Sequence, residues 1–147
     1  MLKVNANGYA IGGLSGGEKK EDFIWIVDFC CQNLPVEKPR YLMGVGFPED
    51  LLVCVCLGVD MFDCVYPSRT ARFGTAFSDK GLLKLKLAKY KYDFSKIDEE
   101  CDCEACSNYT RSFFNTIIGK EEIAAQLLTK HNIRYLLNLM SRLRDSI

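Results

Sequence analysis

Three cysteines and the only histidine of the sequence have the types and spacing of a metal site. Cys101, Cys103 and Cys106 form a C-x-C-x-x-C motif, and His131 follows further along the chain. Three thiolates and one imidazole complete the tetrahedral coordination of zinc, and such a site stabilises structure because no position stays open for a substrate. We therefore predict one structural Zn²⁺ here, with Asn132 or a nearby carbonyl oxygen orienting the imidazole. The alternative is three free cysteines that are close by chance.

A carboxylate near the end of a short apolar segment could do chemistry of its own. Alternation of side chains along a strand places Asp63 on one face with Met61 and Val65, and Asp60 on the other face. Asp63 then has no partner on its face, and a carboxylate in such a position is costly to bury. Strand-end carboxylates of this kind are often catalytic, although a cap on the following turn explains Asp63 equally well.

The elements that must position these residues alternate between strands and helices. We expect strands near residues 8–14, 40–46 and 58–65, with helices between them that end before Pro35 and at about Leu57. This order predicts a parallel sheet whose ligands bind at the carboxyl ends of the strands. Those ends carry residues 12–16, 43–46 and 63–72, which we expect to face one site. Tight turns explain the glycines there equally well.

Local signals refine these elements. Ser15 and Glu18 fit a capping box that opens the first helix, and Arg69 and Arg72 lie in what we expect to be a loop. Beyond it we predict a hairpin of residues 75–77 and 82–86, then helices at 109–118, 121–130 and 133–147. Lysines and aromatic residues alternate between 89 and 96, a mixture that suits a nucleic-acid backbone or an ordinary solvated surface.

Composition limits the class of protein. The 147 residues are 48% hydrophobic and 26% charged, with a net charge of zero, which predicts a globular domain without a basic field for nucleic acid. We find no apolar run that spans a bilayer and no signal peptide, so we expect a soluble intracellular protein in which disulfides are disfavoured. Four further cysteines are therefore predicted to be core thiols: Cys30, Cys31, Cys54 and Cys56.

Several motifs together resemble one enzyme family. They are residues 9–14 with Gly17 and Glu18, residues 39–46, residues 60–65 with Arg69 and Arg72, the C-x-C-x-x-C motif, and His131 with Asn132. In this order they resemble the C-terminal part of tRNA-guanine transglycosylase, also called queuine tRNA-ribosyltransferase. The resemblance implies an α/β fold, the C-terminal part of a (β/α)₈ TIM barrel. It would hold about three βα units, a zinc-binding subdomain and C-terminal helices.

The resemblance also implies a reaction and a role for each matching residue. Guanine at the tRNA wobble position is replaced by queuine, and Asp63 matches the nucleophile that holds the tRNA covalently between the two steps. The base would be bound by Gly13, Leu14, Glu18, Met43 and Gly44, and the RNA by Arg69, Arg72 and, as a weaker candidate, Asp50. The zinc ligands match Cys101, Cys103, Cys106 and His131.

Further expectations follow from the same resemblance. Gly16 stands where bacterial members usually carry a larger side chain, which favours the catalytic subunit of the eukaryotic type and queuine as the incoming base. Such a subunit forms a dimer with a non-catalytic paralogue. It is cytoplasmic, including a pool at the outer face of mitochondria.

The resemblance covers only part of a barrel, which needs about 250 residues. The half that brings the general acid/base is absent, so we expect the chain to be inactive alone. We expect residues 1–74 to carry the active-site loops, residues 75–131 the hairpin and zinc subdomain, and residues 132–147 a C-terminal helix. The alternative function is a zinc-stabilised RNA-binding or interaction module without catalysis.

Overall fold

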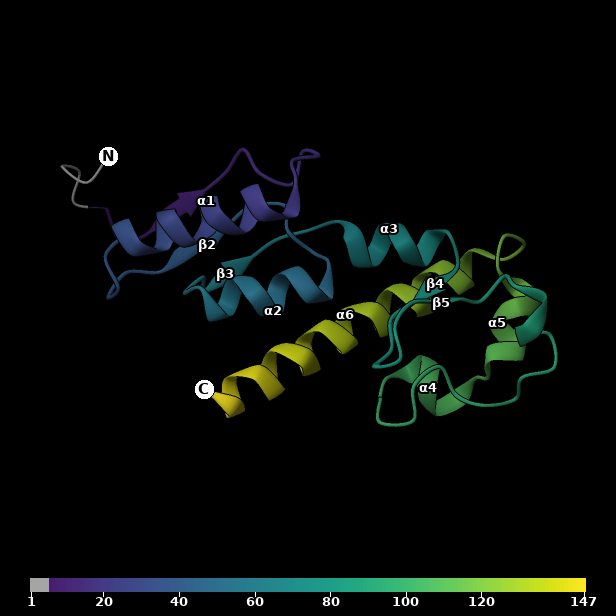
Figure 1. Ribbon diagram of the computed structural model, residues 1–147. Coiled ribbons are helices and arrows are strands. Elements are labelled where there is room, and N and C mark those ends of the chain that lie inside the picture. The colour runs from purple at the N-terminus through teal and green to yellow at the C-terminus, as the bar shows by residue number, and fades with distance from the viewer. Residues whose placement is uncertain (1–5) are drawn as a thin grey trace. The chain divides into compact units, whose positions relative to one another are not determined.

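A three-stranded parallel sheet organises the N-terminal part of the computed structural model, which describes residues 6–147 (Figure 1). The strands are β1 (Tyr9–Ile11), β2 (Arg40–Leu42) and β3 (Met61–Phe62), in that order across the sheet. Helix α1 (Lys20–Asn33) joins the first two strands and α2 (Pro48–Cys56) joins the last two. The predicted β-α-β-α-β order and its parallel sheet are therefore confirmed.

Both helices cover the same face of this sheet. They contact each other, as expected when two successive right-handed crossovers step across a sheet in one direction. Ile11 and Leu42 on the covered face are buried, as are Phe23 and Val27 of α1. The opposite face is open, and Met61 there is 53% exposed.

The first helix does not begin with the predicted capping box. It begins at Lys20, and no side chain caps its first turn. Ser15 instead has a left-handed backbone conformation with φ 61°, because the chain still turns through a glycine-rich loop at this point. Glu18 binds main-chain groups of that loop and lies before the helix.

The prediction of four core thiols is correct for two of them. Cys31 and Cys54 are buried, whereas Cys30 is half-buried and Cys56 is exposed. Cys56 lies two residues beyond Cys54, and two residues turn about 200° around a helix. Cys54 therefore lies on the face of α2 that packs against the rest of the unit, and Cys56 lies on the face exposed to solvent.

The second compact unit is Tyr66–Ile147, following Met1–Val65. It contains α3 (Tyr66–Arg72), a hairpin of β4 (Thr75–Ala76) and β5 (Leu83–Lys84), the 3₁₀ helix η1 (Ala88–Tyr90), and three further helices: α4 (Glu104–Asn108), α5 (Arg111–Ile117) and α6 (Glu122–Ser146). The antiparallel hairpin confirms its prediction. The boundaries expected after residues 74 and 131 stay predictions, and residues 1–5 of the first expected domain lie outside the described residues.

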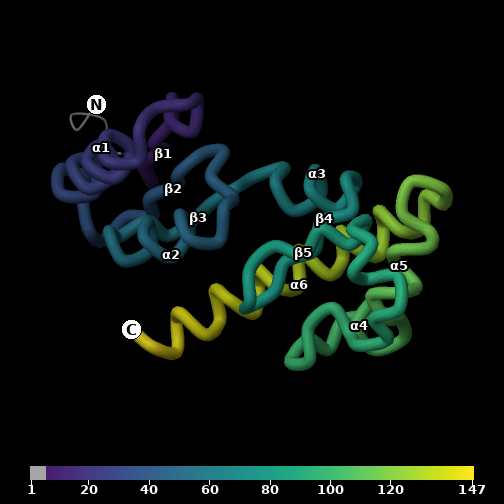
Figure 2. The backbone as a smooth tube through the Cα atoms, turned by 45° about the vertical axis from the view of Figure 1, so that its right-hand side comes forward, coloured from purple at the N-terminus to yellow at the C-terminus, as the bar shows by residue number. Residues whose placement is uncertain are grey.

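One long helix replaces the two that were predicted near the C-terminus. Helix α6 continues from Glu122 to Ser146, and α3 and α4 pack along it (Figure 2). The predicted break at residues 131–132 is wrong because His131 and Asn132 are fully buried polar side chains with partners. They interrupt the apolar pattern without interrupting the helix.

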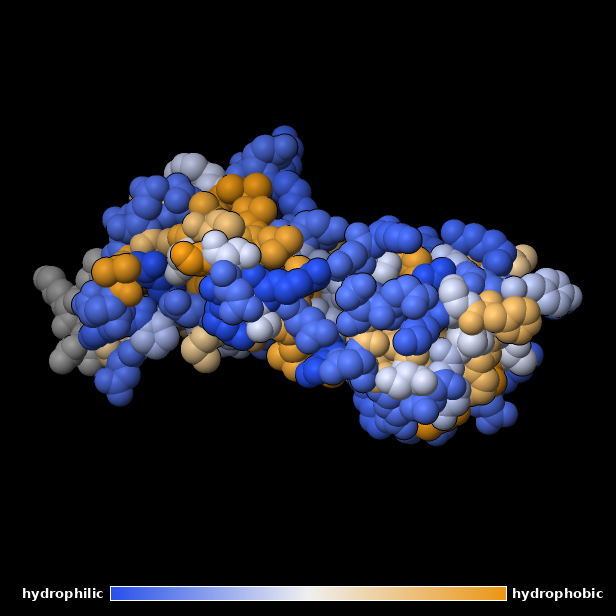
Figure 3. Space-filling view, turned by 90° about the horizontal axis from the view of Figure 1, so that it is seen from below, coloured by the Kyte–Doolittle hydropathy of each residue, from blue (hydrophilic) through white to orange (hydrophobic). Residues whose placement is uncertain are grey.

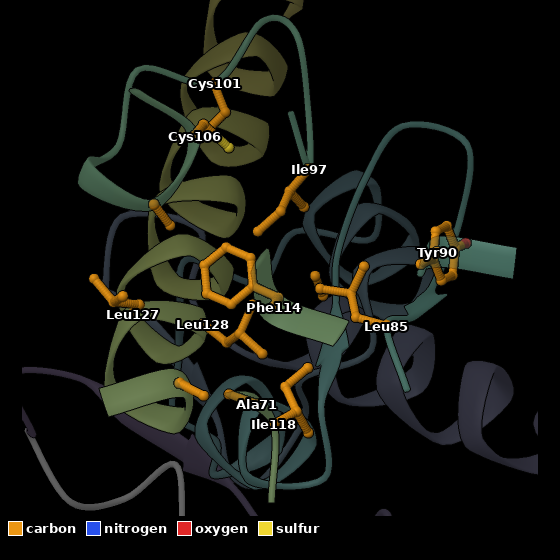
Figure 4. Packing of buried hydrophobic residues seen from close by; sticks show 13 residues of the cluster. Ala71, Leu85, Tyr90, Ile97, Cys101, Cys106, Phe114, Ile118, Leu127 and Leu128 are labelled. Carbon is orange, nitrogen blue, oxygen red and sulfur yellow. The ribbon is translucent and has the colours of Figure 1, made fainter. Parts of the chain in front are cut away.

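The core of the second unit lies between α6 and the segments that fold over it (Figure 4). Phe114, Leu128 and Ile97 are completely buried in it. Gly74, with φ 78°, must be glycine, since a Cβ there would lie 2.7 Å from Cγ2 of Ile118. This close turn brings the hairpin onto the core directly after α3.

The surface carries exposed apolar side chains in both units. In the first unit Trp25 and Phe29 of α1 are 65% and 54% exposed, and their rings stack at a centroid distance of 5.7 Å. Figure 3 shows hydrophobic side chains gathered over part of this unit on the face that it presents. Among residues 6–147, no helix is long and apolar enough to cross a membrane.

Candidate active site and metal centre

Asp63 follows directly after β3, at the carboxyl edge of the parallel sheet. It is exposed, but it has partners. The hydroxyl of Tyr41 donates to its Oδ1 at 2.5 Å, and the main-chain N–H of Gly44 donates to the same oxygen at 3.1 Å. The expectation of an unpartnered carboxylate is therefore wrong, since Tyr41 of the neighbouring strand and Gly44, two residues beyond its end, supply the donors.

The strand register explains how Tyr41 reaches Asp63. Tyr41 of β2 pairs with Met61 of β3, and residues two apart along a strand share a face. Asp63 is thus the diagonal neighbour of Tyr41 on the open face of the sheet. Sequence reasoning missed Tyr41 because alternation within one strand says nothing about the register between two strands.

These contacts set the charge of the pair. The Tyr41 hydrogen bond, followed by that of Gly44, holds the pKa of Asp63 below its usual value. The same bond raises the pKa of Tyr41. Asp63 is therefore a carboxylate, and Tyr41 a neutral donor, throughout the neutral range.

The ends of β1 and β2 meet next to this carboxylate. The main-chain N–H of Met43 donates to the carbonyl oxygen of Ile11 at 3.0 Å. A Cβ on Gly12 would lie 3.2 Å from the sulfur of Met43, so the methionine side chain lies over the glycine. Gly13 and Gly44 both have positive φ, 78° and 76°, a conformation that glycine adopts without strain.

Glu18 holds the loop between β1 and α1. Its Oε1 accepts from the N–H of Ser15 at 2.5 Å, and its Oε2 accepts from Gly16 at 2.9 Å. Main-chain N–H groups, its own first and then that of Ser15, lower the pKa of Glu18. Because a trans peptide points its N–H and C=O in opposite directions, the carbonyl of Leu14 faces away from Glu18.

Three predicted RNA-binding residues lie on helices. Asp50 accepts from Lys20 of α1 at 2.5 Å and thereby links α2 to α1. Arg69 and Arg72 are exposed on α3, and the expected loop around them is wrong. That helix is only seven residues long, too short for a periodic signal, and it places the two arginines three residues apart on one face. Asp63 and the arginines belong to different units, so their convergence stays a prediction.

The three cysteines and His131 come together as the sequence predicts. Cys101 follows a loop, Cys103 and Cys106 lie at α4, and His131 lies on α6. The four ligand atoms all lie within 4.8 Å of one another. The Nδ1 atom of His131 is 3.6, 3.4 and 3.3 Å from the three sulfurs in sequence order. Tetrahedral zinc separates a sulfur and a nitrogen ligand by about 3.5 Å, so this donor set fits zinc.

The imidazole is oriented from the other side. Its Nε2 lies 2.8 Å from the carbonyl oxygen of Phe77, and a carbonyl only accepts, so Nε2 carries the proton and Nδ1 is free to bind a metal. Of the two predicted partners, the carbonyl is confirmed. The Asn132 side chain contacts the hairpin segment instead: its Oδ1 accepts from the N–H of Phe77, and its Nδ2 donates to the carbonyl oxygen of Thr75.

The three cysteine thiols compete for negative charge: the pKa of one is lowered and those of the other two are raised. A hydrogen bond with Cys106 lowers the pKa of Cys103, and a hydrogen bond with His131 acts in the same direction. The same bond raises the pKa of Cys106, and burial raises that of Cys101. A metal ion would relieve this competition because all three cysteines can then be thiolates beside the neutral imidazole.

The family model for queuine tRNA-ribosyltransferase matches residues 1–147. The queuine tRNA-ribosyltransferase catalytic subunit of Caenorhabditis elegans is 54% identical over 148 residues, which cover 100% of this chain and 37% of that protein. The catalytic subunit of Schizosaccharomyces pombe is 49% identical over 154 residues, covering 100% and 38%.

A bacterial relative matches equally well. The queuine tRNA-ribosyltransferase of Caldanaerobacter subterraneus subsp. tengcongensis is 53% identical over 148 residues, covering 100% of this chain and 40% of that protein. The chain thus spans less than half the length of the curated relatives that it matches. Since the match extends from the first residue to the last, the chain belongs to the queuine tRNA-ribosyltransferase family.

Proposed function

We propose that this chain carries the nucleophile of a queuine tRNA-ribosyltransferase, which replaces guanine at the tRNA wobble position with queuine through a covalent tRNA–Asp63 intermediate. The observation that carries the proposal is the state of Asp63. It is exposed, ionised and held at the carboxyl edge of the sheet by Tyr41 and Gly44. A carboxylate held in this way is suited to attack a sugar carbon.

The groups around Asp63 suit the recognition of a flat base. The main chain at Gly13 and Leu14 hydrogen-bonds the base, and Met43 with Gly44 forms a wall of its pocket. Glu18 fixes the peptide between Leu14 and Ser15 through the hydrogen bond described above. In the reaction, a carboxylate oxygen of Asp63 attacks C1′ of the ribose, and the electron pair of the glycosidic bond leaves with guanine.

A second set of residues holds the RNA itself. Arg69 and Arg72 present two cations on one face of α3, where they bind nucleotides of the anticodon loop. Asp50 is a weaker candidate, since Lys20 already occupies its carboxylate. The general acid that protonates the departing guanine belongs to the remainder of the enzyme, so this chain is inactive alone.

One zinc ion bound by Cys101, Cys103, Cys106 and His131 supplies structural stability when present. All four coordination positions would be filled by protein, so the ion would take no part in base exchange. The residues of the site join three elements. The four ligands lie at α4 and α6, and His131 also contacts the carbonyl oxygen of Phe77 in the hairpin segment.

The sheet corresponds to about three βα units of a (β/α)₈ barrel. Both crossover helices cover one face, while the other face leaves Ala10 and Met61 exposed. In a barrel the open face is the interior and is covered by the remaining strands. Further protein therefore completes the first unit.

The complete enzyme is a cytoplasmic, tRNA-binding dimer. Its second subunit is a non-catalytic paralogue, and a pool associates with the outer face of mitochondria. Gly16 leaves room for the larger part of queuine, as in the eukaryotic type.

A covalent adduct tests the proposed function. We would join the chain to the N-terminal portion of the Caenorhabditis elegans relative and incubate the protein with wobble-guanine tRNA and a base analogue. An adduct that survives denaturation and is lost in Asp63→Asn is expected. Asp60→Asn is the matched control, because Asp60 binds the main-chain N–H of Arg40 and the amide keeps an acceptor oxygen. Absence of any adduct in the joined protein would refute the proposal.

The same experiment tests the second candidate, a zinc-stabilised RNA-binding module. Four exposed side chains lie close together in the sequence: Lys89, Lys91, Tyr92 and Phe94. Aromatic side chains among cations suit the binding of single-stranded RNA. Binding of tRNA without an adduct would favour this alternative.

A further inference from the structure

We infer that Tyr41 is a positioning residue that anchors one carboxylate oxygen of Asp63 and so assigns the attack on ribose to the other. The inference rests on the proposed function and deepens it. Both hydrogen bonds from other residues reach Oδ1, from the Tyr41 hydroxyl and the Gly44 N–H. In the described part of the chain, Oδ2 accepts none from another residue and is therefore the nucleophilic atom.

The anchor is built by the backbone. Gly44 has φ 76° and no atom within 4 Å of an added Cβ, so its constraint is conformational and not one of space. The left-handed turn directs its N–H at Asp63 only two residues after β2 ends. Tyr41 reaches the same oxygen because its strand register is fixed by the pairing of Leu42 with Phe62.

The two donors act differently in the two chemical steps. In the first step, an electron pair of Oδ2 forms the bond to C1′, and the pair of the C1′–guanine bond leaves with guanine. Oδ1 then becomes the carbonyl oxygen of the ester and keeps both donors. In the second step, a nitrogen of the incoming base attacks C1′ and gives its proton to the acid/base group that the remainder of the enzyme supplies, while the C1′–Oδ2 pair returns to Asp63 as carboxylate charge.

Donors on Oδ1 stabilise that returning charge, so they make Asp63 a better leaving group. They do not make it a stronger nucleophile, because they also stabilise the carboxylate before attack. Loss of the Tyr41 hydroxyl should therefore slow breakdown of the ester more than its formation. A merely structural role would slow both steps alike.

The test compares Tyr41→Phe with a matched variant in the joined protein described above. We expect the adduct of Tyr41→Phe to survive a chase with free base at least about 10-fold longer, the effect of one hydrogen bond to a charged group. The acid limb of the rate profile should move to higher pH, because the main cause of the low Asp63 pKa is removed. Tyr109→Phe should change neither, since the Tyr109 ring stacks on Phe113 and its hydroxyl has no hydrogen bond among the described residues.

A titration of the chain itself separates this inference from the proposed function. Carboxyl NMR should show the pKa of Asp63 rising toward its ordinary 3.8 in Tyr41→Phe and staying low with 3-fluorotyrosine in place of Tyr41, which keeps the donor and the shape of the ring. An unchanged pKa, or equal slowing of both steps, would overturn the inference. If the parent protein forms no adduct but the titration behaves as expected, the proposed function fails and the anchoring of Oδ1 stands.

Discussion

Nε2 of His131 lies 2.8 Å from the carbonyl oxygen of Phe77, and the N–H of Phe77 donates to Asn132 at 2.9 Å. Two consecutive residues of α6 thus hold both polar groups of one residue in the hairpin segment. The same histidine faces three cysteine sulfurs through its other nitrogen. The metal centre and the attachment of the hairpin to α6 are therefore one connected structure.

Replacing Asn132 should weaken both parts of this structure. Its amide also donates to the carbonyl oxygens of Pro67 and Thr75, at 3.0 Å each, and the side chain is fully buried. We expect Asn132→Ala to lower the free energy of unfolding by about 2–4 kcal/mol, because buried polar groups lose their partners. Zinc affinity should fall by about 10-fold, since the backbone that orients His131 loosens. Denaturant unfolding and competition with a chelator measure the two effects.

Asn138→Ala is the matched control for that change. Asn138 lies on the same helix and is half-buried, and its side chain makes no hydrogen bond among the described residues. Its loss should alter stability by no more than about 0.5 kcal/mol. Equal effects of the two substitutions would show that the Phe77 contacts contribute nothing particular.

Metal analysis should find one zinc ion per chain in freshly purified protein. The ion would join two segments that are distant in sequence, residues 101–106 and His131 of α6, so its removal by a chelator should reduce the helical circular-dichroism signal. Cys106→Ser should remove zinc binding, whereas Cys56→Ser, which changes an exposed thiol outside the site, should retain one ion. Purified parent protein without bound metal would refute the assignment.

Short-range patterns in the sequence predicted most of what is local. The three cysteines of the metal site are separated by only a few residues, and a histidine is the natural fourth ligand. The order of strands and helices in the first unit follows from glycine and proline at the ends of apolar segments. These features need no knowledge of which segments meet.

The errors arise where contacts between distant segments decide the outcome. Tyr41 was missed because only the register between β2 and β3 shows that it faces Asp63. Helix α6 was divided because the polar residues His131 and Asn132 interrupt its apolar pattern, and only their contacts with distant residues show that both are buried within one helix. Glu18 looked like a helix cap because the glycine loop that it binds has no signal in the periodicity.

Substitution of Gly16 should change the choice of base without harming the fold. Gly16 is not one of the glycines with a positive φ. The nearest atom to a Cβ added at Gly16 would be Oε2 of Glu18, at 3.9 Å. Among the described residues, neither the backbone conformation nor the packing therefore requires glycine here, which fits a position that leaves room for a ligand. We expect Gly16→Val in the joined protein to reduce use of queuine by about 10-fold or more, because a pocket distinguishes ligands that differ by a few carbon atoms to this extent.

Exchange of guanine for guanine, which needs no extra room, is the internal control and should change little. If Gly16→Val used queuine and guanine as well as the parent protein does, this role of Gly16 would be contradicted. Loss of both activities together would indicate that the Glu18 loop has been displaced.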